Sequence, residues 1–137
     1  MRDAIVNYLK ANKRELTPLL VSEQLPYSPD NNEPLYMKNK KHIYVDLDQV
    51  SQNTALNALD GSGATNEHTN IRAFFVTDAK QPIPNYEAVV QVMKNARLTA
   101  ELNQLGVTQR LCTVSTSYHT DSVITQFEYH FVQLIPL

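Results

Sequence analysis

The sequence predicts an α+β fold in which a mainly antiparallel sheet has two helices packed on one face. Helical apolar spacing occurs in residues 2–12 and 85–106, and strand patterns occur in other segments: alternation in residues 42–50 and 108–135, and a run that is apolar on both faces in residues 71–78. The length of 137 residues and the hydrophobic content of 42% suit one ordinary core. We therefore expect residues 1–137 to form a single domain.

The N-terminal segment RDAIVNYLKAN is predicted to form a short amphipathic helix, because Ile5, Tyr8 and Leu9 follow helical i, i+3, i+4 spacing. The prolines that follow forbid a long helix. Residues 17–36 are therefore predicted to be a proline-rich arm that contains only short extended pieces, such as residues 19–25.

The segment KHIYVDLDQV is predicted to be a strand with one wet face. Its residues alternate, with Ile43, Val45 and Leu47 on one face and Tyr44, Asp46 and Asp48 on the other. Asp46 and Asp48 have the spacing of a carboxylate pair that holds Mg²⁺ or divides acid and base work. Since no other residue in the sequence completes a metal shell, we interpret them as polar positions on a wet face. A small hydrolase or transferase that uses this pair with a histidine stays as an alternative.

Residues 57–70 are predicted to be a flexible loop, because residues 53–70 show no sustained apolar period and contain two glycines. The loop is not a phosphate cradle, since no Gly-Lys-Ser/Thr follows the glycines and the next element is a strand. We interpret it as an assembly loop that orders on a partner. Its candidate residues are Gly61, Ser62, Gly63, Asn66, Glu67 and His68.

The segment IRAFFVTD, residues 71–78, is apolar on both faces and is predicted to be a central strand. One long helix is predicted next, over residues 85–106, with Asn85 as N-cap and Gly106 as C-cap. One stripe of this helix consists of Tyr86, Val89, Val90, Met93, Ala96, Arg97 and Ala100. This helix is expected to cover one face of the sheet.

Residues 108–135 are predicted to form an antiparallel hairpin that turns at about residues 119–122. Phe127, Tyr129 and Phe131 alternate with a wet face made of Gln126, Glu128 and His130. A turn centred between residues 121 and 122 places Cys112 opposite Phe131 and puts His130 on the other face. The thiol is therefore predicted to pack in the core rather than to act as a nucleophile.

Composition excludes several classes of function. The net charge of -2 and the pI of about 6.0 disfavour sequence-specific DNA binding. The basic clusters KANKR and KNKK are interpreted as solvated faces, with non-specific phosphate contact as the alternative. The single cysteine, the charged N-terminus and the lack of a long apolar run indicate a protein of the reducing cytosol with no membrane span. The four histidines, at positions 42, 68, 119 and 130, lack zinc-site spacing, so we expect no metal or other cofactor.

The order of these segments resembles a known family of viral proteins. A short first helix and a proline-rich arm precede HIYVDLDQV, IRAFFVTDAK, PNYEAVVQVMKNARL and the closing hairpin RLCTVSTSYHTDSVITQFEYHFVQL. Over nearly the full chain this pattern is similar to the tail terminator, or head-to-tail joining, proteins of long-tailed bacteriophages. It includes no motif of high specificity.

The resemblance implies a structural virion protein without catalytic activity. Members of the family form hexameric rings that cap the tail tube, stop its polymerisation and dock to the connector or stopper of the head. DNA passes non-specifically through the lumen of the ring, and assembly takes place in the host cytoplasm. The expected interface residues are Tyr44, Asp46, Asp48, Gln126, Glu128 and His130, on the two wet strand faces. Another head- or tail-completion ring adaptor is the closest alternative.

Overall fold

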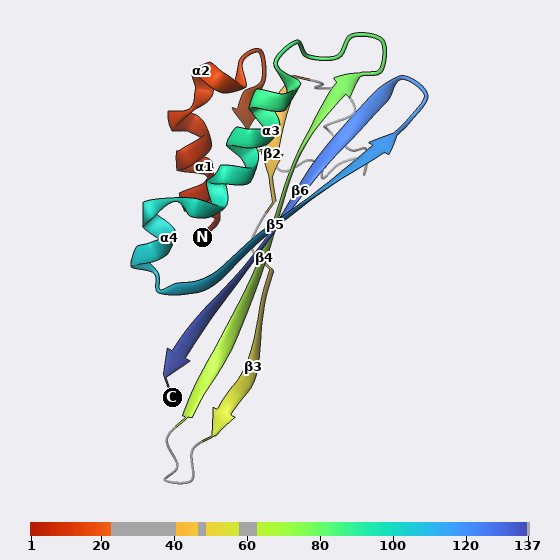
Figure 1. Ribbon diagram of the computed structural model, residues 1–137. Helices are drawn as coiled ribbons and strands as arrows, with labels where there is room; N and C mark the ends of the chain where they lie inside the picture. Colours follow the sequence, from red (N-terminus) through yellow and green to blue (C-terminus); the bar gives the residue numbers. More distant parts are fainter. Residues whose placement is uncertain (23–40, 47–48, 58–62, 137) are drawn as a thin grey trace, which may run out of the picture.

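The computed structural model describes residues 1–22, 41–46, 49–57 and 63–136. It confirms the predicted α+β class: a mostly antiparallel sheet carries the helices on one face (Figure 1). In chain order the elements are α1 (Arg2–Ala11), α2 (Lys13–Leu16), β1 (Leu20–Ser22), β2 (His42–Val45), β3 (Gln49–Asn57), β4 (Gly63–Asp78), α3 (Tyr86–Asn95), the 3-10 helix η2 (Ala96–Leu98), α4 (Ala100–Gln104), β5 (Val107–Tyr118) and β6 (Ser122–Pro136).

Two long strands form the axis of the sheet. The 16 residues of β4 and the 15 residues of β6 pair antiparallel from Ala64 opposite Pro136 to Asp78 opposite Ser122. The strand order is β1-β2-β4-β6-β5, with β1 parallel to β2, and β3 pairs with the first half of β4. Figure 1 shows β3 and the adjoining ends of β4 and β6 extending beyond the part of the sheet that the helices cover.

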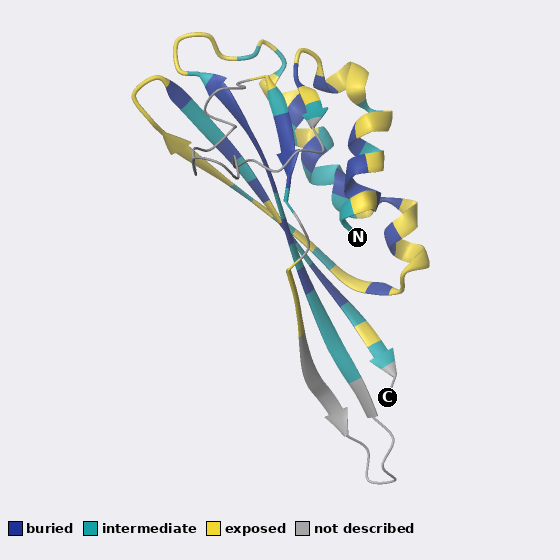
Figure 2. Ribbon diagram, turned by 180° about the vertical axis from the view of Figure 1, so that it is seen from behind, coloured by how far each residue is buried: buried dark blue, intermediate teal, exposed yellow. Residues whose placement is uncertain are grey.

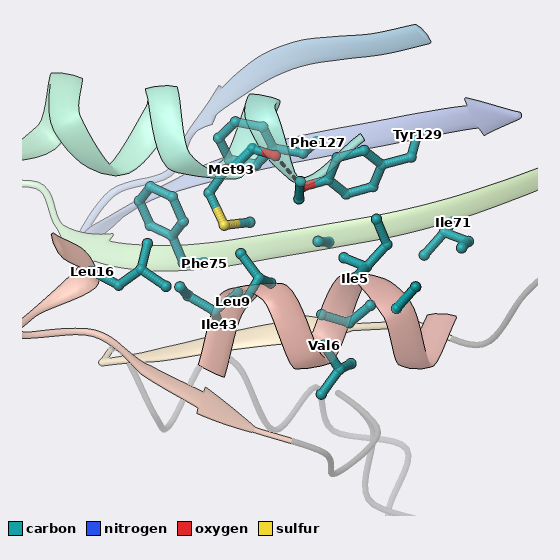
Figure 3. Packing of buried hydrophobic residues seen from close by; sticks show 14 of the residues in the cluster. Ile5, Val6, Leu9, Leu16, Ile43, Ile71, Phe75, Met93, Phe127 and Tyr129 are labelled. Carbon is teal, nitrogen blue, oxygen red and sulfur yellow. Dashed lines mark hydrogen bonds between the residues drawn. The ribbon is translucent and has the colours of Figure 1, made fainter. Parts of the chain in front are cut away.

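The core lies between the helices and one face of the sheet (Figure 3). Alternation along β4 directs Ile71, Ala73 and Phe75 toward the helices, and the neighbouring strand β6 adds Phe127, Tyr129 and Phe131. The helices contribute, among others, Ile5 and Leu9 from α1 and Val89 and Met93 from α3. Burying one such large apolar side chain contributes about 1.5–3 kcal/mol, so this layer positions the helices on the sheet.

The predicted long helix over residues 85–106 is wrong, because the chain forms α3, η2 and α4 there instead. Thr99 has an extended backbone (φ -61°, ψ 147°), which separates η2 from α4 and allows Leu102 to be buried. Asn85 does not cap α3 with its side chain. Its Nδ2 donates to the carbonyl oxygens of Glu15 (2.9 Å) and Thr17 (2.8 Å), which ties the start of α3 to the end of α2.

Gly106 follows α4 with φ 74°, the left-handed conformation expected of a residue just after a helix end. A Cβ at this position would meet no atom within 4 Å, so a substitution changes backbone strain and not packing. Gly106→Ala is expected to lower the free energy of unfolding by about 1 kcal/mol, and Gly106→Asn by less, since asparagine tolerates this conformation. Urea denaturation of the three proteins tests this order. Equal stability of all three would contradict it.

The predicted flexible loop over residues 57–70 is wrong for residues 63–70. These residues belong to β4, including the predicted loop positions Gly63, Asn66, Glu67 and His68. They pair with β3 on one side and with β6 on the other. Backbone hydrogen bonds to both neighbouring strands therefore hold this segment as a strand, although its side chains show no apolar period. Gly61 and Ser62 lie outside the described residues. In the predicted arm over residues 17–36, β1 forms at Leu20–Ser22, and residues 23–36 lie outside the described part.

The hairpin of β5 and β6 is confirmed, but its register differs by two residues from the prediction. Cys112 lies opposite Tyr129, not Phe131, because the turn is centred between Thr120 and Asp121. The His119 backbone N–H donates to the Ser122 carbonyl at 2.8 Å and closes this turn.

Candidate functional site

Several predicted interface residues share the sheet face that points away from the helices, here called the open face. Asp46, Gln126, Glu128 and His130 lie on it, together with Arg72, because alternate residues of β4 and β6 point the same way. A shallow recess of about 240 Å³ is lined by Asp46, Gln49, Asn70, Ile71, Arg72, Gln126 and Glu128. The two wet strand segments predicted from the sequence thus meet on one surface.

An ion pair fixes the charge pattern of the open face. The Arg72 guanidinium donates from Nε and Nη2 to Asp46 Oδ2, at 2.7 and 2.5 Å. The Asp46 backbone N–H donates to the Arg72 carbonyl at 2.8 Å, and the guanidinium carbon lies 5.5 Å from the centre of the Phe74 ring. Asp46 is therefore engaged in a structural pair across two strands. Asp48, its predicted partner, lies outside the described residues.

The prediction that Tyr44 belongs to the wet face is wrong. Tyr44 lies opposite Phe74 in the β2–β4 ladder, with ring centroids 5.5 Å apart, and is only 1% exposed. Its ring also stacks on His42 at 6.0 Å. Period-2 alternation indicates which face a side chain occupies, but it does not indicate whether that part of the face is exposed.

The structure brings together two histidines that are far apart in the sequence. His68 Nδ1 and His130 Nε2 are 3.3 Å apart, and His130 Nδ1 is 2.6 Å from Asn70 Oδ1. With a neutral His130 whose Nδ1–H donates to the Asn70 amide oxygen, the Nε2 of His130 accepts from His68. Within the described parts of the chain, no group of three His, Cys, Asp or Glu side chains is placed to hold a metal ion.

The outer edge of β5 is the second candidate surface. Within the described residues β5 pairs only with β6, so its other edge presents unpaired backbone groups. Its 12 residues include no proline and one charge, at Arg110. Leu111 and Tyr118 are 58% and 80% exposed, and Figure 2 shows the end of β5 near the turn as exposed. Natural edges usually carry lysines, prolines or bulges that prevent pairing with another chain, and residues 111–118 lack these protections.

The direction of the edge amides follows from the turn. Because His119 and Ser122 form a hydrogen-bonded pair, every second pair along the ladder is also hydrogen-bonded. The backbone N–H groups of Cys112, Val114 and Thr116 belong to the alternate pairs and therefore point away from β6. They are available donors for an additional strand.

A basic groove lies beside this edge, between β5 and the end of the α3–η2 segment. It measures about 420 Å³ and is lined by Gln91, Lys94, Arg97, Arg110, Leu111 and Cys112. The lining contains three cations and no carboxylate. Sequence reasoning missed this groove, because it placed Arg97 on the sheet-facing stripe of the predicted helix and gave Lys94 no role. Only the fold brings Arg110 beside them.

Cys112 is half-buried at the wall of this groove and packs against the core. Its predicted core position is therefore right only in part. Burial raises the pKa of the Cys112 thiol, and the positive charges of Arg97 and Lys94 partly offset this effect. His130 lies opposite Leu111, so the thiol and this imidazole are on different faces of the sheet, as predicted.

The remaining sequence features add no further site. Lys10, Lys13, Arg14 and Lys41 are exposed, and the other two lysines of the KNKK cluster lie outside the described residues. None of the described helices is long and apolar enough to cross a membrane. No protein-family model matches the chain, and no curated protein matches its sequence.

Proposed function

We propose that the protein is a structural component of a phage tail, which forms a ring on the end of the tail tube, ends tube polymerisation and joins the tail to the head. The observation that carries this proposal is the outer edge of β5, which pairs with no other described strand. A long edge strand without protective charges or prolines is suited to strand addition, in which a partner's extended segment continues the sheet. The resemblance of the whole chain to tail terminator proteins supplies the class of partner.

The open face supplies a second, separate surface for contacts between copies of the chain. Its polar groups, including the Arg72–Asp46 pair, Glu128 and His130, suit a polar interface that is hydrated before assembly. A contact between two different surfaces, repeated by one fixed rotation, closes into a ring when that rotation divides a full turn by a whole number and involves no shift along the axis. The resemblance implies six copies, with DNA passing through the lumen without sequence-specific contacts.

Strand addition is tested by removing one outward amide from β5. Thr116→Pro is expected to abolish capping of tail tubes, because proline deletes an N–H that points away from β6 and leaves the β5–β6 ladder in place. Thr116→Val is the matched control, since valine keeps the amide and suits a strand. Tube length and end-capping are measured by negative-stain electron microscopy after mixing each protein with polymerising tube protein. The unmodified protein and Thr116→Val should limit tube growth.

Circular dichroism and urea denaturation of the same variants show whether Thr116→Pro stays folded. A folded Thr116→Pro protein that caps tubes normally would contradict docking through β5. Failure of the unmodified protein to form rings or cap tubes at high concentration would contradict the terminator function. Rings that bind the head connector but not the tube would identify the alternative, a head-completion adaptor.

A further inference from the structure

We propose that the groove beside β5 binds an extended acidic segment of a partner protein, which pairs with β5 as an added strand and directs its carboxylates to Lys94, Arg97 and Arg110. The inference rests on the proposed function only for the partner's identity as a tail component. The binding chemistry follows from the described residues themselves.

No carboxylate of the described residues compensates the charge of the groove. Among the described residues no carboxylate lies within ion-pair distance of Lys94, Arg97 or Arg110. Like charges gathered on a low-dielectric wall repel one another, and an anionic ligand relieves this repulsion. The groove therefore selects for negative charge.

Arg110 adds a donor that the fold leaves unused. Its Nη2 donates to Asn103 Oδ1 and, at 3.2 Å, to the Val107 carbonyl, which holds the side chain against α4. Its Nε is buried without a hydrogen-bond partner among the described residues. A buried polar atom without a partner costs free energy. A hydrogen bond from this nitrogen to a ligand oxygen therefore adds more to the binding free energy than a hydrogen bond from an exposed cation does.

The geometry of the edge favours a peptide strand as the ligand. Cys112 and Val114 present their amides to the open edge, while the side chains of Arg110 and Cys112 point to the helix-covered side of the sheet. A strand added to β5 also places every second side chain on that side, at intervals of about 6.6–6.8 Å. Carboxylates at alternate positions of the added strand therefore lie along the groove.

Two other occupants fit less well. The described edge strands of this chain, β1 (LVS), β3 (QVSQNTALN) and β5 itself (VTQRLCTVSTSY), contain no acidic residue. A second copy that pairs through any of them therefore brings no carboxylate to the cations. The groove lining contains no aromatic side chain on which a nucleic-acid base would stack. A phosphate chain would also leave the backbone donors of β5 unused. A separate acidic polypeptide provides acceptors both for the outward amides of β5 and for the three cations of the groove.

The test uses the full chain and a fluorescent peptide of alternating Glu and Val, with a matched Gln–Val peptide as the uncharged control. Fluorescence anisotropy is expected to show tighter binding of the Glu peptide, by about tenfold or more at low salt, because three cations each contribute about two- to fivefold. Lys94→Glu with Arg97→Glu should remove this preference. Lys80→Glu, on an exposed turn away from the groove, should retain it.

Two further readouts separate strand addition from simple charge attraction. The Glu peptide should slow maleimide labelling of Cys112, since the thiol lines the groove. Thr116→Pro should weaken peptide binding while Thr116→Val should not. Three results would each overturn the inference: equal binding of both peptides, unchanged labelling of Cys112 in the presence of the Glu peptide, or unchanged affinity of Thr116→Pro for that peptide. A polyphosphate that binds the groove more tightly than the Glu peptide, and displaces it, would also overturn the inference.

The outcome is distinguishable from that of the proposed function. A protein that binds the Glu peptide through β5 but never caps tubes has an acidic-strand site and is not a tail terminator. A protein that caps tubes but shows no preference for the Glu peptide is a terminator whose partner strand is not acidic.

Discussion

Phe75→Ala is expected to lower the free energy of unfolding by about 3–5 kcal/mol. Phe75 is completely buried on the helix side of β4, and its ring lies 6.1 Å from that of Phe127 and 6.3 Å from that of Tyr86. Because the central strand is paired on both sides, the surrounding backbone cannot move in to fill the cavity left by the ring. The loss should therefore lie near the upper part of this range.

Equilibrium urea denaturation followed by circular dichroism measures this loss. Tyr118→Ala provides the matched control, since it removes an aromatic ring that is 80% exposed and should change stability by less than about 0.5 kcal/mol. A loss below about 1 kcal/mol for Phe75→Ala would show that the helices do not pack on this face of the sheet as described.

Tyr129→Phe is expected to lower the free energy of unfolding by about 1–2 kcal/mol at neutral pH. The Tyr129 hydroxyl donates to the Met93 carbonyl at 2.6 Å, which ties the centre of β6 to the end of α3 in the core (Figure 3). Removing the hydroxyl leaves that carbonyl without this donor in a dry environment. The aromatic contact with Phe131 is retained, so the change isolates the hydrogen bond.

The same residue is expected to make the protein sensitive to alkali. Burial raises the pKa of the Tyr129 hydroxyl well above its ordinary value of 10.0. The unfolded chain loses this proton near pH 10, while the folded chain retains it, so stability is complete below pH 10 and falls as the pH rises toward the folded pKa. The slope for one proton is about 1.4 kcal/mol per pH unit.

Cys112 also makes the folded protein less stable as the pH rises, because burial raises the pKa of its thiol. This effect begins near pH 9.0, the ordinary pKa of a cysteine. Comparing Cys112→Ala with Cys112→Ala/Tyr129→Phe therefore isolates the tyrosine. The free energy of unfolding is measured by urea denaturation at several pH values between 8 and 11. Above pH 10 it should fall more steeply with pH for Cys112→Ala than for Cys112→Ala/Tyr129→Phe. Identical slopes would show that the hydroxyl of Tyr129 is not buried.

The sequence alone determined the α+β class and most of the strands. One face of each strand near the helices is buried, and this burial imposes the period-2 pattern that is visible in Phe127, Tyr129 and Phe131. The end of the helical region at Gly106 was also predictable, because a positive φ favours glycine. These features depend on local spacing or on one residue, so no knowledge of distant contacts was needed.

Only the tertiary structure decided that residues 63–70 form a strand, because their order comes from backbone pairing with β3 and β6 and not from apolar side chains. Distant pairing also buried Tyr44 against Phe74 and brought His68 beside His130. The basic groove arises in the same way. Lys94 and Arg97 meet Arg110 only because Thr99 interrupts the helix and the chain turns at Gly106 into β5. The position of this turn in space is set by long-range packing that local spacing does not encode.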